Sequence, residues 1–474
     1  MNATATTIDL SVEATPGYVH ADHLTPDSAA LTSDLLNINH AAYHTRWEAT
    51  FHNHIVHHQL ALWALGATPG EIQAMWDFNT PYQSSIQRNG ATLLPDFDLT
   101  DPVVFTASLG KDECYDHFLK FFEAEVAAKG MQTVVREYVL QGDARADDIL
   151  GRMFSDLVHP MIHLGCGIEF HQPAIVAEAL AGACVHDNWP IKFLIPTEQY
   201  VRTEPNLPRR SLLEILDALR QDPEIASGVK ASDPFNKIPD GFLQRITADQ
   251  LAPVLGQFQV APTDEGLQRG MADLMYTAAF MVGAAQRPGK RESIDFVLLH
   301  CCTLAVFFPA ILAQDWLSNE HKARLLTATA RVNAVMYAGC GSPALDASRV
   351  LTYQPRQPST GWRELFQRAV IYRDEGHAAK LVRALYSLEA LPEPAPGFPL
   401  NKGDFLTIAH MVMDSIEMAF EADGPQVPQS VSEGIRDRLG PGAGMVVDNM
   451  RRWVFYGGLE GAWDRRPDLR TVSR

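Results

Sequence analysis

Residues 51–71 read FHNHIVHHQLALWALGATPGE, and this stretch shows the pattern on which the fold class depends. From His54 onward the apolar positions follow the 3.6-residue repeat of a helix, and Gly66 suits the end of that helix. Thr68 can then cap a following helix, and Glu71 can reach back to close a capping box. This short stretch therefore predicts a helix, a turn and a second helix.

The same helical signals recur along the 474 residues, whereas strand signals are weak throughout. Ser211 and Glu214 repeat the capping-box spacing. We therefore expect a mainly α protein with one large, bundle-like helical domain over residues 36–474, with long loops, and an irregular N-terminal arm over residues 1–35. Hydrophobic residues make up 46% of the chain, which is enough to bury a large core.

Charge and cysteine content argue against several classes of partner. The formal net charge is −18, so there is no excess of positive charge for binding nucleic acid or an anionic membrane surface. The six cysteines include no C-x-x-C pair, which indicates reduced thiols in a reducing compartment. The N-terminus lacks the features of a signal peptide. We therefore expect a cytoplasmic protein, and the sequence leaves its oligomeric state open.

Residues 296–313 form an uncharged run that is close to the length of a membrane span. The run contains His300 and Pro309, and no asymmetry of positive charge flanks it. Helices that are hydrophobic on all sides also occur in the cores of large proteins. We expect a buried core helix here, with a membrane span as the alternative, and its histidine then needs a buried partner.

Many of the seventeen histidines fall at helical spacing. His54 and His58 share one helix face, with Cβ atoms about 5–6 Å apart. His159 and His163 have the i,i+4 spacing at which two imidazoles can bind one metal. Because Pro160 follows His159, this pair either straddles a kink or follows a helix start at the proline. For any one of these histidines alone, a hydrogen-bonded core residue is the alternative to a ligand.

A further cluster combines His377 with Lys380, and both share a helix face with Leu381. Lysine is rarely buried without a partner, so one alternative is that Lys380 pairs with an acid or extends to the surface. The other is that burial lowers the pKa of the amine, which can then take up carbon dioxide as a carbamate. A carbamate would serve as a carboxylate-like metal ligand.

Four blocks of the sequence resemble the questin oxidase-like family, and they occur in the family's order. They are NINHAAYHTRWEATFHNHIVHHQLALWALGATPGEIQAMWDFNTPYQ from residue 37, LVHPMIHLGCGIEF from residue 157, IDFVLLHCCTLAVFFP from residue 294 and DEGHAAKLVRAL from residue 374. Four ordered blocks, each with its own histidine, are far more specific than any single one.

The resemblance implies an oxygenase of aromatic polyketide metabolism that opens the central ring of an anthraquinone-type substrate with dioxygen. It also implies a non-haem Fe(II) centre made by four histidines and a carboxylated lysine, with His377 and Lys380 acting in catalysis. Carried over to this chain, the ligands would be drawn from His58, His159, His163, His300, His377 and Lys380. Six candidates for five ligand positions mean that one supports the site from outside, and the sequence does not choose it.

Cysteines follow His300 where serine or threonine is more usual in the family, so the exact polycyclic substrate stays open. The resemblance also carries an alternative, because some members are described as NADPH-dependent Baeyer-Villiger oxygenases. Residues 339–344 match the letters of a G-x-G-x-x-A dinucleotide turn, but they follow a helical pattern. A non-enzymatic alternative is a helical scaffold with a structural zinc, although such sites favour cysteine ligands.

Overall fold

The computed structural model describes residues 3–48, 51–86 and 97–469. It confirms the predicted mainly α fold, because almost all regular structure in these residues is helical. The two strands found there are β1 (Arg46–Trp47) and β2 (Phe51–His52), which pair antiparallel. Arg46 lies opposite His52, and Trp47 lies opposite Phe51.

The chain groups into two compact units, each assembled from segments that are far apart in the sequence. Unit 1 consists of Met1–Lys192, Phe307–His321 and Val370–Lys380. Unit 2 consists of Phe193–Val306, Lys322–Ala369 and Leu381–Arg474. The division into an arm and one domain over residues 36–474 stays a prediction.

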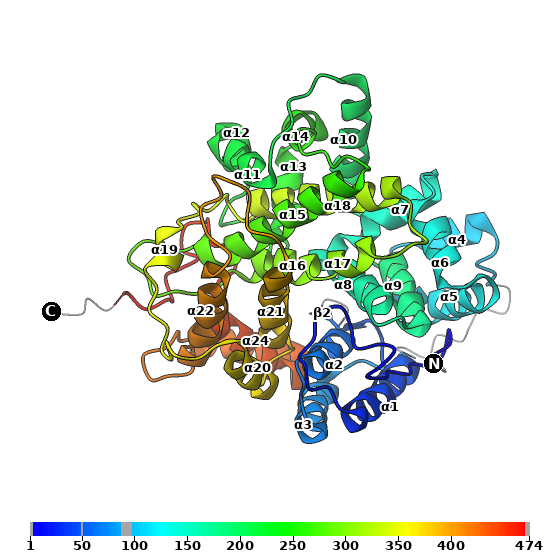
Figure 1. Ribbon diagram of the computed structural model, residues 1–474, viewed down its shortest axis with the longest axis horizontal. Helices are drawn as coiled ribbons and strands as arrows, with labels where there is room; N and C mark the ends of the chain where they lie inside the picture. Colours follow the sequence, from blue (N-terminus) through cyan, green and yellow to red (C-terminus); the bar gives the residue numbers. More distant parts are fainter. Residues whose placement is uncertain (1–2, 49–50, 87–96, 470–474) are drawn as a thin grey trace. The chain divides into compact units, whose positions relative to one another are not determined.

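Unit 1 contains ten complete α-helices among its described residues (Figure 1). They are α1 (Pro26–Ala42), α2 (Ile55–Ala64), α3 (Pro69–Asn79), α4 (Pro102–Ser108), α5 (Tyr115–Lys129), α6 (Met131–Val135), α7 (Ala144–Met153), α8 (Ser155–Glu169), α9 (Pro173–Val185) and α17 (Phe308–Leu312). Helix α9 contacts α8 and α5, and α2 contacts α1, α3 and α8. Almost every residue of α2, α8 and α9 is buried, so these three helices form the core of the unit.

Unit 2 holds most of the later helices. Those wholly within it are α11 (Leu212–Gln221), α12 (Pro223–Ala226), α13 (Leu243–Arg245), α14 (Ala248–Leu255), α15 (Asp264–Ala284), α16 (Phe296–Ala305), α19 (Ser348–Leu351), α22 (Asp404–Met418), α23 (Gln429–Leu439) and α24 (Ala443–Arg452). Helices α10 (Ile191–Thr203), α18 (Asn319–Gly339), α20 (Trp362–Ile371) and α21 (His377–Tyr386) each contain residues of both units. Within unit 2, α15 packs against α16 and α22.

The helix boundaries predicted from capping motifs are confirmed. The Thr68 hydroxyl accepts from the backbone N–H of Glu71, and the Glu71 side chain closes the capping box at the start of α3. Ser211 and Glu214 form the same box at α11. Gly66 follows α2 with a φ of +80°, a conformation that glycine adopts without strain.

A helix begins within residues 1–35. Helix α1 begins at Pro26, and Thr25 caps it by accepting from the backbone N–H of Ser28. A threonine followed by proline is a strong helix-start signal, since proline suits the first helical position. Helical structure therefore begins inside the segment that was expected to be irregular.

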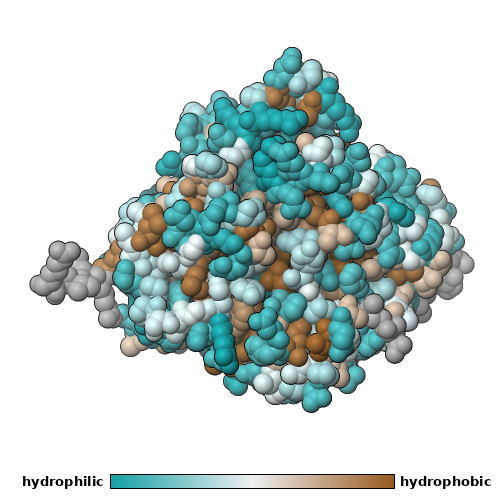
Figure 2. Space-filling view, in the orientation of Figure 1, coloured by the Kyte–Doolittle hydropathy of each residue, from teal (hydrophilic) through white to brown (hydrophobic). Residues whose placement is uncertain are grey.

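The uncharged run at residues 296–313 is buried, as expected, but it forms two helices. Helix α16 ends at Ala305, and α17 begins at Phe308 with Pro309 in its first turn. Pro309 has no N–H group to donate to the carbonyl of Ala305, four residues earlier, and α16 ends at that residue. Within the described part of the chain, no helix has the length and hydropathy needed to cross a membrane. The face drawn in Figure 2 is largely hydrophilic, with hydrophobic residues scattered among polar ones.

Candidate metal centre

Helix α2 carries adjacent histidines into the core of unit 1. The chain enters from β2, and His54 immediately precedes the helix. All ten residues of α2 are buried, including His57 and His58. Because the segment IVHHQLALWA has no charged face, the first turn of the helix is buried together with its imidazoles.

Helix α8 places His159 and His163 just after a kink. Asp156, Leu157 and Val158 all have left-handed backbone angles, with φ values of 48°, 52° and 63°. Such angles cost about 1–2 kcal/mol for a residue with a Cβ atom. Regular helix begins at His159, so the structure has the helix start near Pro160 that was one of the two expected alternatives.

The histidines of α2 and α8 face each other in two pairs. Nε2 of His54 lies 2.8 Å from Nε2 of His159. Nε2 of His57 lies 3.2 Å from Nδ1 of His163. Two nitrogens on neighbouring positions of one metal would be about 3 Å apart for bonds of about 2.1 Å. The first pair therefore has a separation that a shared metal would also require.

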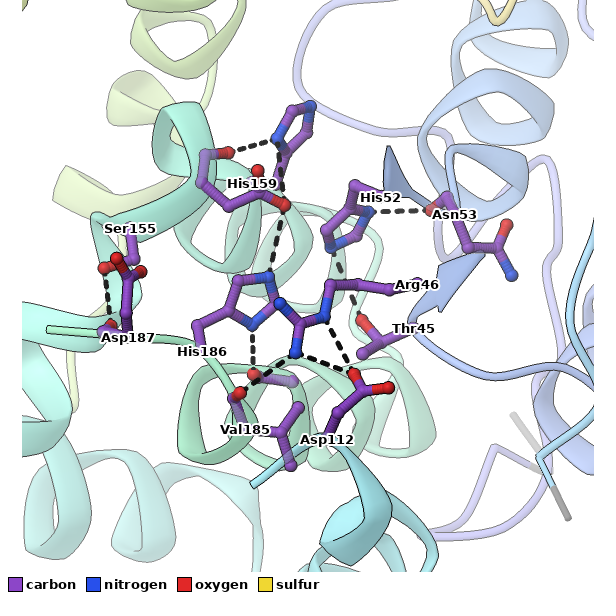
Figure 3. Close-up of polar contacts among 12 residues, drawn as sticks. Thr45, Arg46, His52, Asn53, Asp112, Ser155, His159, Val185, His186 and Asp187 are labelled. Carbon is purple, nitrogen blue, oxygen red and sulfur yellow. Dashed lines mark hydrogen bonds and ion pairs between the residues drawn. The ribbon is translucent and has the colours of Figure 1, made fainter. Parts of the chain in front are cut away.

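Two further imidazoles, His52 and His186, extend this cluster (Figure 3). The His52 ring stacks on the His159 ring with centroids 4.7 Å apart. Nδ1 of His52 lies 2.9 Å from the carbonyl oxygen of Asn53. Nε2 of His186 lies 3.2 Å from a carboxylate oxygen of Asp156. Asp156 of the kinked segment therefore contacts the histidine cluster through His186.

The start of α21 approaches α2 closely. Asp374 accepts from the backbone N–H groups of Gly376 and Ala378 and so caps this helix. Gly376 has a φ of +87°, and a Cβ atom there would lie 2.5 Å from Cγ of His58. Glycine satisfies both the backbone angle and the close approach. The ring of His377 then meets the ring of His54 edge-on, with centroids 4.9 Å apart.

Lys380 lies one helical turn after His377 and is only 6% exposed. Among the described residues, its amine has no hydrogen-bond partner. Burial lowers the pKa of the amine to about 8, although the carboxylates of Asp374 and Glu375 oppose this change. The amine therefore gives up its proton more readily than an exposed lysine.

The imidazoles around it are held neutral. Burial lowers the pKa of His54 and His57 well below the usual range, and Lys380 and other histidines lower it further. Burial and then Lys380 lower the pKa of His58 to about 3. A neutral imidazole keeps one nitrogen lone pair, which is the form that binds metals.

The structure brings five of the six predicted ligands into unit 1: His58, His159, His163, His377 and Lys380. His300 lies on α16 of unit 2, where its Nδ1 is 2.7 Å from the carbonyl oxygen of Phe296. That contact leaves Nε2 as the nitrogen able to bind a metal, and the ligand role of His300 stays a prediction.

Sequence reasoning left out several members of this cluster. They are His52, His57, His186 and the carboxylates of Asp156, Glu178 and Glu375, while His54 was placed on the face of His58 but was not among the predicted ligands. The block at residues 51–58 held the signal, because four histidines in eight residues exceed what one helix face needs. The carboxylates had no such signal, since each becomes relevant only through tertiary packing.

The donor set fits a transition metal ion. Nδ1 of His57, Nε2 of His58 and Nζ of Lys380 are buried and have no hydrogen-bond partner among the described residues. An unsatisfied buried polar atom costs about 1–3 kcal/mol, which a bound cation would relieve at a lone pair. Two groups of three residues each offer ligand atoms that lie within 4.8 Å of one another inside the group. One group is His52, His54 and His57, and the other is His54, Glu375 and His377.

Comparison with known proteins places this chain in a family. The family model described as questin oxidase-like matches residues 51–385. The oxidoreductase AflY of Aspergillus parasiticus is 44% identical over 99% of this chain and 95% of its own length. The Baeyer-Villiger monooxygenase dmxR6 of a Cryptosporiopsis species is 36% identical, over 84% of this chain and 91% of its own length. The questin oxidase of Aspergillus fumigatus is 35% identical over 87% of this chain and 94% of its own length. This chain therefore belongs to the questin oxidase-like family of oxidoreductases.

Proposed function

We propose that this chain is a non-haem iron dioxygenase of secondary metabolism, which opens the central ring of an anthraquinone-type polyketide. The names of its relatives, which include questin oxidases and Baeyer-Villiger monooxygenases, support oxygenation of an aromatic polyketide. The observation that carries the iron-dependent mechanism is the amine of Lys380. It is buried beside neutral imidazoles, and it has no hydrogen-bond partner among the described residues.

Lys380 is proposed to bind the metal as a carbamate. Its neutral amine adds to carbon dioxide, so that a nitrogen–carbon bond forms, one proton leaves and the side chain ends in a carboxylate. An unmodified ammonium could not bind a cation, because it has three donors and no lone pair. The lowered pKa of Lys380 makes the neutral amine accessible near neutral pH.

His58 and His377 form the proposed core of the site together with Lys380. Gly376 lets α21 approach the His58 ring, and His377 lies one turn from Lys380 on the same helix. His159 is the third histidine proposed within unit 1, and a ligand role for His300 of unit 2 stays the prediction that the family resemblance implies. His163 is proposed to support the site from outside, since its Nε2 lies 2.7 Å from the carboxylate of Glu178, whereas Nε2 of His159 faces the imidazole of His54.

Imidazoles with one carboxylate-like oxygen suit Fe(II), although they also accept other divalent metals. When bound, iron would supply the redox chemistry that lets dioxygen react with an organic substrate. The chain's own residues hold the ligands in place and exclude water from them. The cap that Asp374 makes on α21 fixes the start of the helix from which His377 and Lys380 project.

Metal analysis combined with oxygen uptake tests this proposal. Protein purified without added metal is expected to contain about one iron per chain, and it should consume dioxygen with an anthraquinone or its reduced form. Finding only zinc, with no activity restored by ferrous salt, would contradict the proposal. It would favour instead the scaffold with a structural metal.

The names of several relatives favour a second candidate, a Baeyer-Villiger monooxygenase, for which the family resemblance implies NADPH. The glycine pair at residues 339–341 lies at the end of α18 and not after a strand, so it differs from a dinucleotide-binding turn. We expect NADPH to be dispensable when the reduced substrate is supplied chemically. Strict NADPH dependence under those conditions, with one atom incorporated from labelled dioxygen, would establish the monooxygenase.

A further inference from the structure

A hydrogen-bonded array joins the surface of unit 1 to the histidine cluster. It begins at Glu123 on α5, whose side chain is 21% exposed and lies 3.0 Å from Nε2 of His40 on α1. Nδ1 of His40 lies 2.6 Å from Glu178 on α9, and the other oxygen of Glu178 lies 2.7 Å from Nε2 of His163. His163 then contacts Nε2 of His57 at 3.2 Å. Five helices thus contribute one side chain each.

The charges of this array are balanced. Burial alone would raise the pKa of Glu178, but hydrogen bonds from His163 and His40 lower it to about 2. Burial likewise lowers the pKa of His40, but its bonds to Glu123 and Glu178 raise it to about 10. Near neutral pH, Glu178 is therefore a carboxylate and His40 is its cationic partner.

This arrangement determines which nitrogen of His57 carries a lone pair. A carboxylate can only accept, so the Nε2–H of His163 donates to Glu178. With that proton on Nε2, Nδ1 of His163 is the acceptor, and the Nε2–H of His57 donates to it. Because His57 is neutral, its Nδ1 holds a lone pair. That nitrogen is buried and has no hydrogen-bond partner among the described residues.

The opposite arrangement is less favourable. If Nδ1 of His163 donated to His57, the proton of His57 would move to its Nδ1. A buried N–H group without an acceptor would result, and no cation could relieve it. The carboxylate of Glu178 therefore favours the lone pair at Nδ1 of His57.

His52 is oriented by the same kind of outer partner. Its Nδ1–H donates to the backbone carbonyl of Asn53, which leaves the lone pair on Nε2. Imidazoles that bind metals usually donate their other N–H to a carbonyl or, as in the array behind His57, toward a carboxylate. His52, His54 and His57 each offer one ring nitrogen, and these three nitrogens lie within 4.8 Å of one another.

We propose that His52, His54 and His57 form a second binding position for a divalent first-row transition metal ion, distinct from the position that contains Lys380. Glu178 and His163 are its positioning residues, because they hold His57 with a lone pair at Nδ1. The inference builds on the proposed function, which uses one metal and leaves these three histidines without a role. Three imidazoles leave a further coordination position open for an oxygen donor, such as a substrate hydroxyl.

Titration of the metal-free full-length protein with cobaltous ion, followed by its visible absorption, tests the proposal directly. The wild-type protein is expected to bind two equivalents. His57→Ala and His52→Ala should each lose the equivalent bound at the second position and keep the one bound at the position that contains Lys380. Lys380→Ala should lose only the equivalent at its own position. A wild-type protein that binds a single equivalent, or a His57→Ala variant that still binds two, would overturn the second position.

The two proposals fail in different ways in this experiment. If no equivalent depends on Lys380 while one depends on His57, the proposed iron centre fails and the second position stands. If only the equivalent that depends on Lys380 exists, the second position fails and the proposed function stands.

Glu178→Gln tests the positioning role with a nearly isosteric change. Loss of an outer partner typically lowers metal affinity about 10–100-fold, and we expect this loss only at the position that depends on His57. In the double variant Glu178→Gln/His57→Ala, the position that contains Lys380 should bind cobaltous ion as tightly as it does in His57→Ala alone. Glu125→Gln on the same helix as Glu123 is the matched control, because Glu125 bonds to Lys129 and Tyr138 outside the array. Equal weakening of both positions by Glu178→Gln, with native circular dichroism, would overturn the positioning role.

Discussion

Glu178 and Lys380 are both ionisable and almost fully buried in unit 1, with 3% and 6% exposure, but their surroundings differ. Glu178 receives hydrogen bonds from His163 and His40, and its pKa is lowered to about 2, so it keeps its charge. The amine of Lys380 has no hydrogen-bond partner among the described residues, and its pKa is lowered to about 8. The difference shows that burial alone does not define a reactive group.

A buried carboxylate with two donors is stabilised in a single state, and so it can orient other groups. A buried amine without a partner is destabilised in its charged state, and so it is poised for covalent modification or metal binding. The same core thus holds an anchor at α9 and a reactive group at α21. Four experiments test this contrast.

The largest effect is expected for Lys380→Ala, which removes the proposed carbamate. Iron content and oxygen uptake should fall by more than the roughly 100-fold that loss of an outer partner causes. Lys380→Arg should fail as well, because a guanidinium stays charged and cannot take up carbon dioxide in this way. Small carboxylic acids that fit the vacated space should restore part of the activity of Lys380→Ala.

Lys322→Ala is the control for that experiment, since Lys322 is a buried lysine on α18. It should retain iron and activity. Electron density that shows Lys380 ending at a bare amine and paired with an acid would remove the basis of the contrast.

The second experiment compares the stability of the metal-free protein after each buried group is replaced by methionine. Glu178→Met removes the buried partner of the His40 cation, which keeps its contact with the partly exposed Glu123, and breaking a buried pair in this way costs about 3–5 kcal/mol. Lys380→Met removes an amine that makes no hydrogen bond to the described residues, so we expect an unchanged or higher unfolding temperature. Thermal unfolding of both variants provides the measurement, and equal destabilisation would show that the two sites do not differ.

The third experiment uses pH to separate the two ends of the array. The pKa of His40 is raised from 6.5 to about 10, so its stabilising contribution is complete below pH 6.5 and is lost as pH rises toward 10. The pKa of Glu178 is lowered from 4.5 to about 2, so its contribution is complete above pH 4.5 and is lost as pH falls toward 2.

The difference in unfolding temperature between wild type and His40→Asn should therefore shrink between pH 6.5 and 10. The difference for Glu178→Gln should shrink fully in acid but only in part at high pH, because Glu178 keeps its contact with His163 when His40 loses its charge. A difference for either variant that does not change with pH would contradict the ion pairing on which the contrast rests.

The sequence predicted one side of this contrast and not the other. Lys380 stands three residues after His377 on a face of leucines, so helical periodicity alone indicated that it is buried. Glu178 stands alone in the apolar helix α9, and its partners come from α1 and α8, which local periodicity cannot bring together. Helices and caps could be predicted because their signals are local, as Thr68 and Glu71 show.

The choice among the histidines depended on tertiary contacts in the same way. The i,i+4 spacing of His159 and His163 placed both on one helix face. It did not indicate that His163 meets a carboxylate while His159 meets another imidazole. The left-handed angles at Asp156, Leu157 and Val158 were also unpredictable, since none of these residues is glycine and the surrounding core imposes the conformation.

The smallest effect is expected for Glu123→Gln, at the exposed end of the array. Glu123 is 21% exposed, and contacts of this kind near the surface contribute about 0–1 kcal/mol because water and salt screen them. His40 keeps its bond to Glu178 in this variant, so Glu178 stays ionised and His57 keeps its orientation. We therefore expect the unfolding temperature to change by no more than a few degrees, and cobaltous ion to bind as tightly as in wild type.

The same measurements on Glu125→Gln supply the baseline for losing a carboxylate from α5. If Glu123→Gln weakened metal binding as strongly as Glu178→Gln, the orientation of His57 would depend on the whole array and not on the buried carboxylate, and Glu178 would no longer be the anchor that distinguishes α9 from α21.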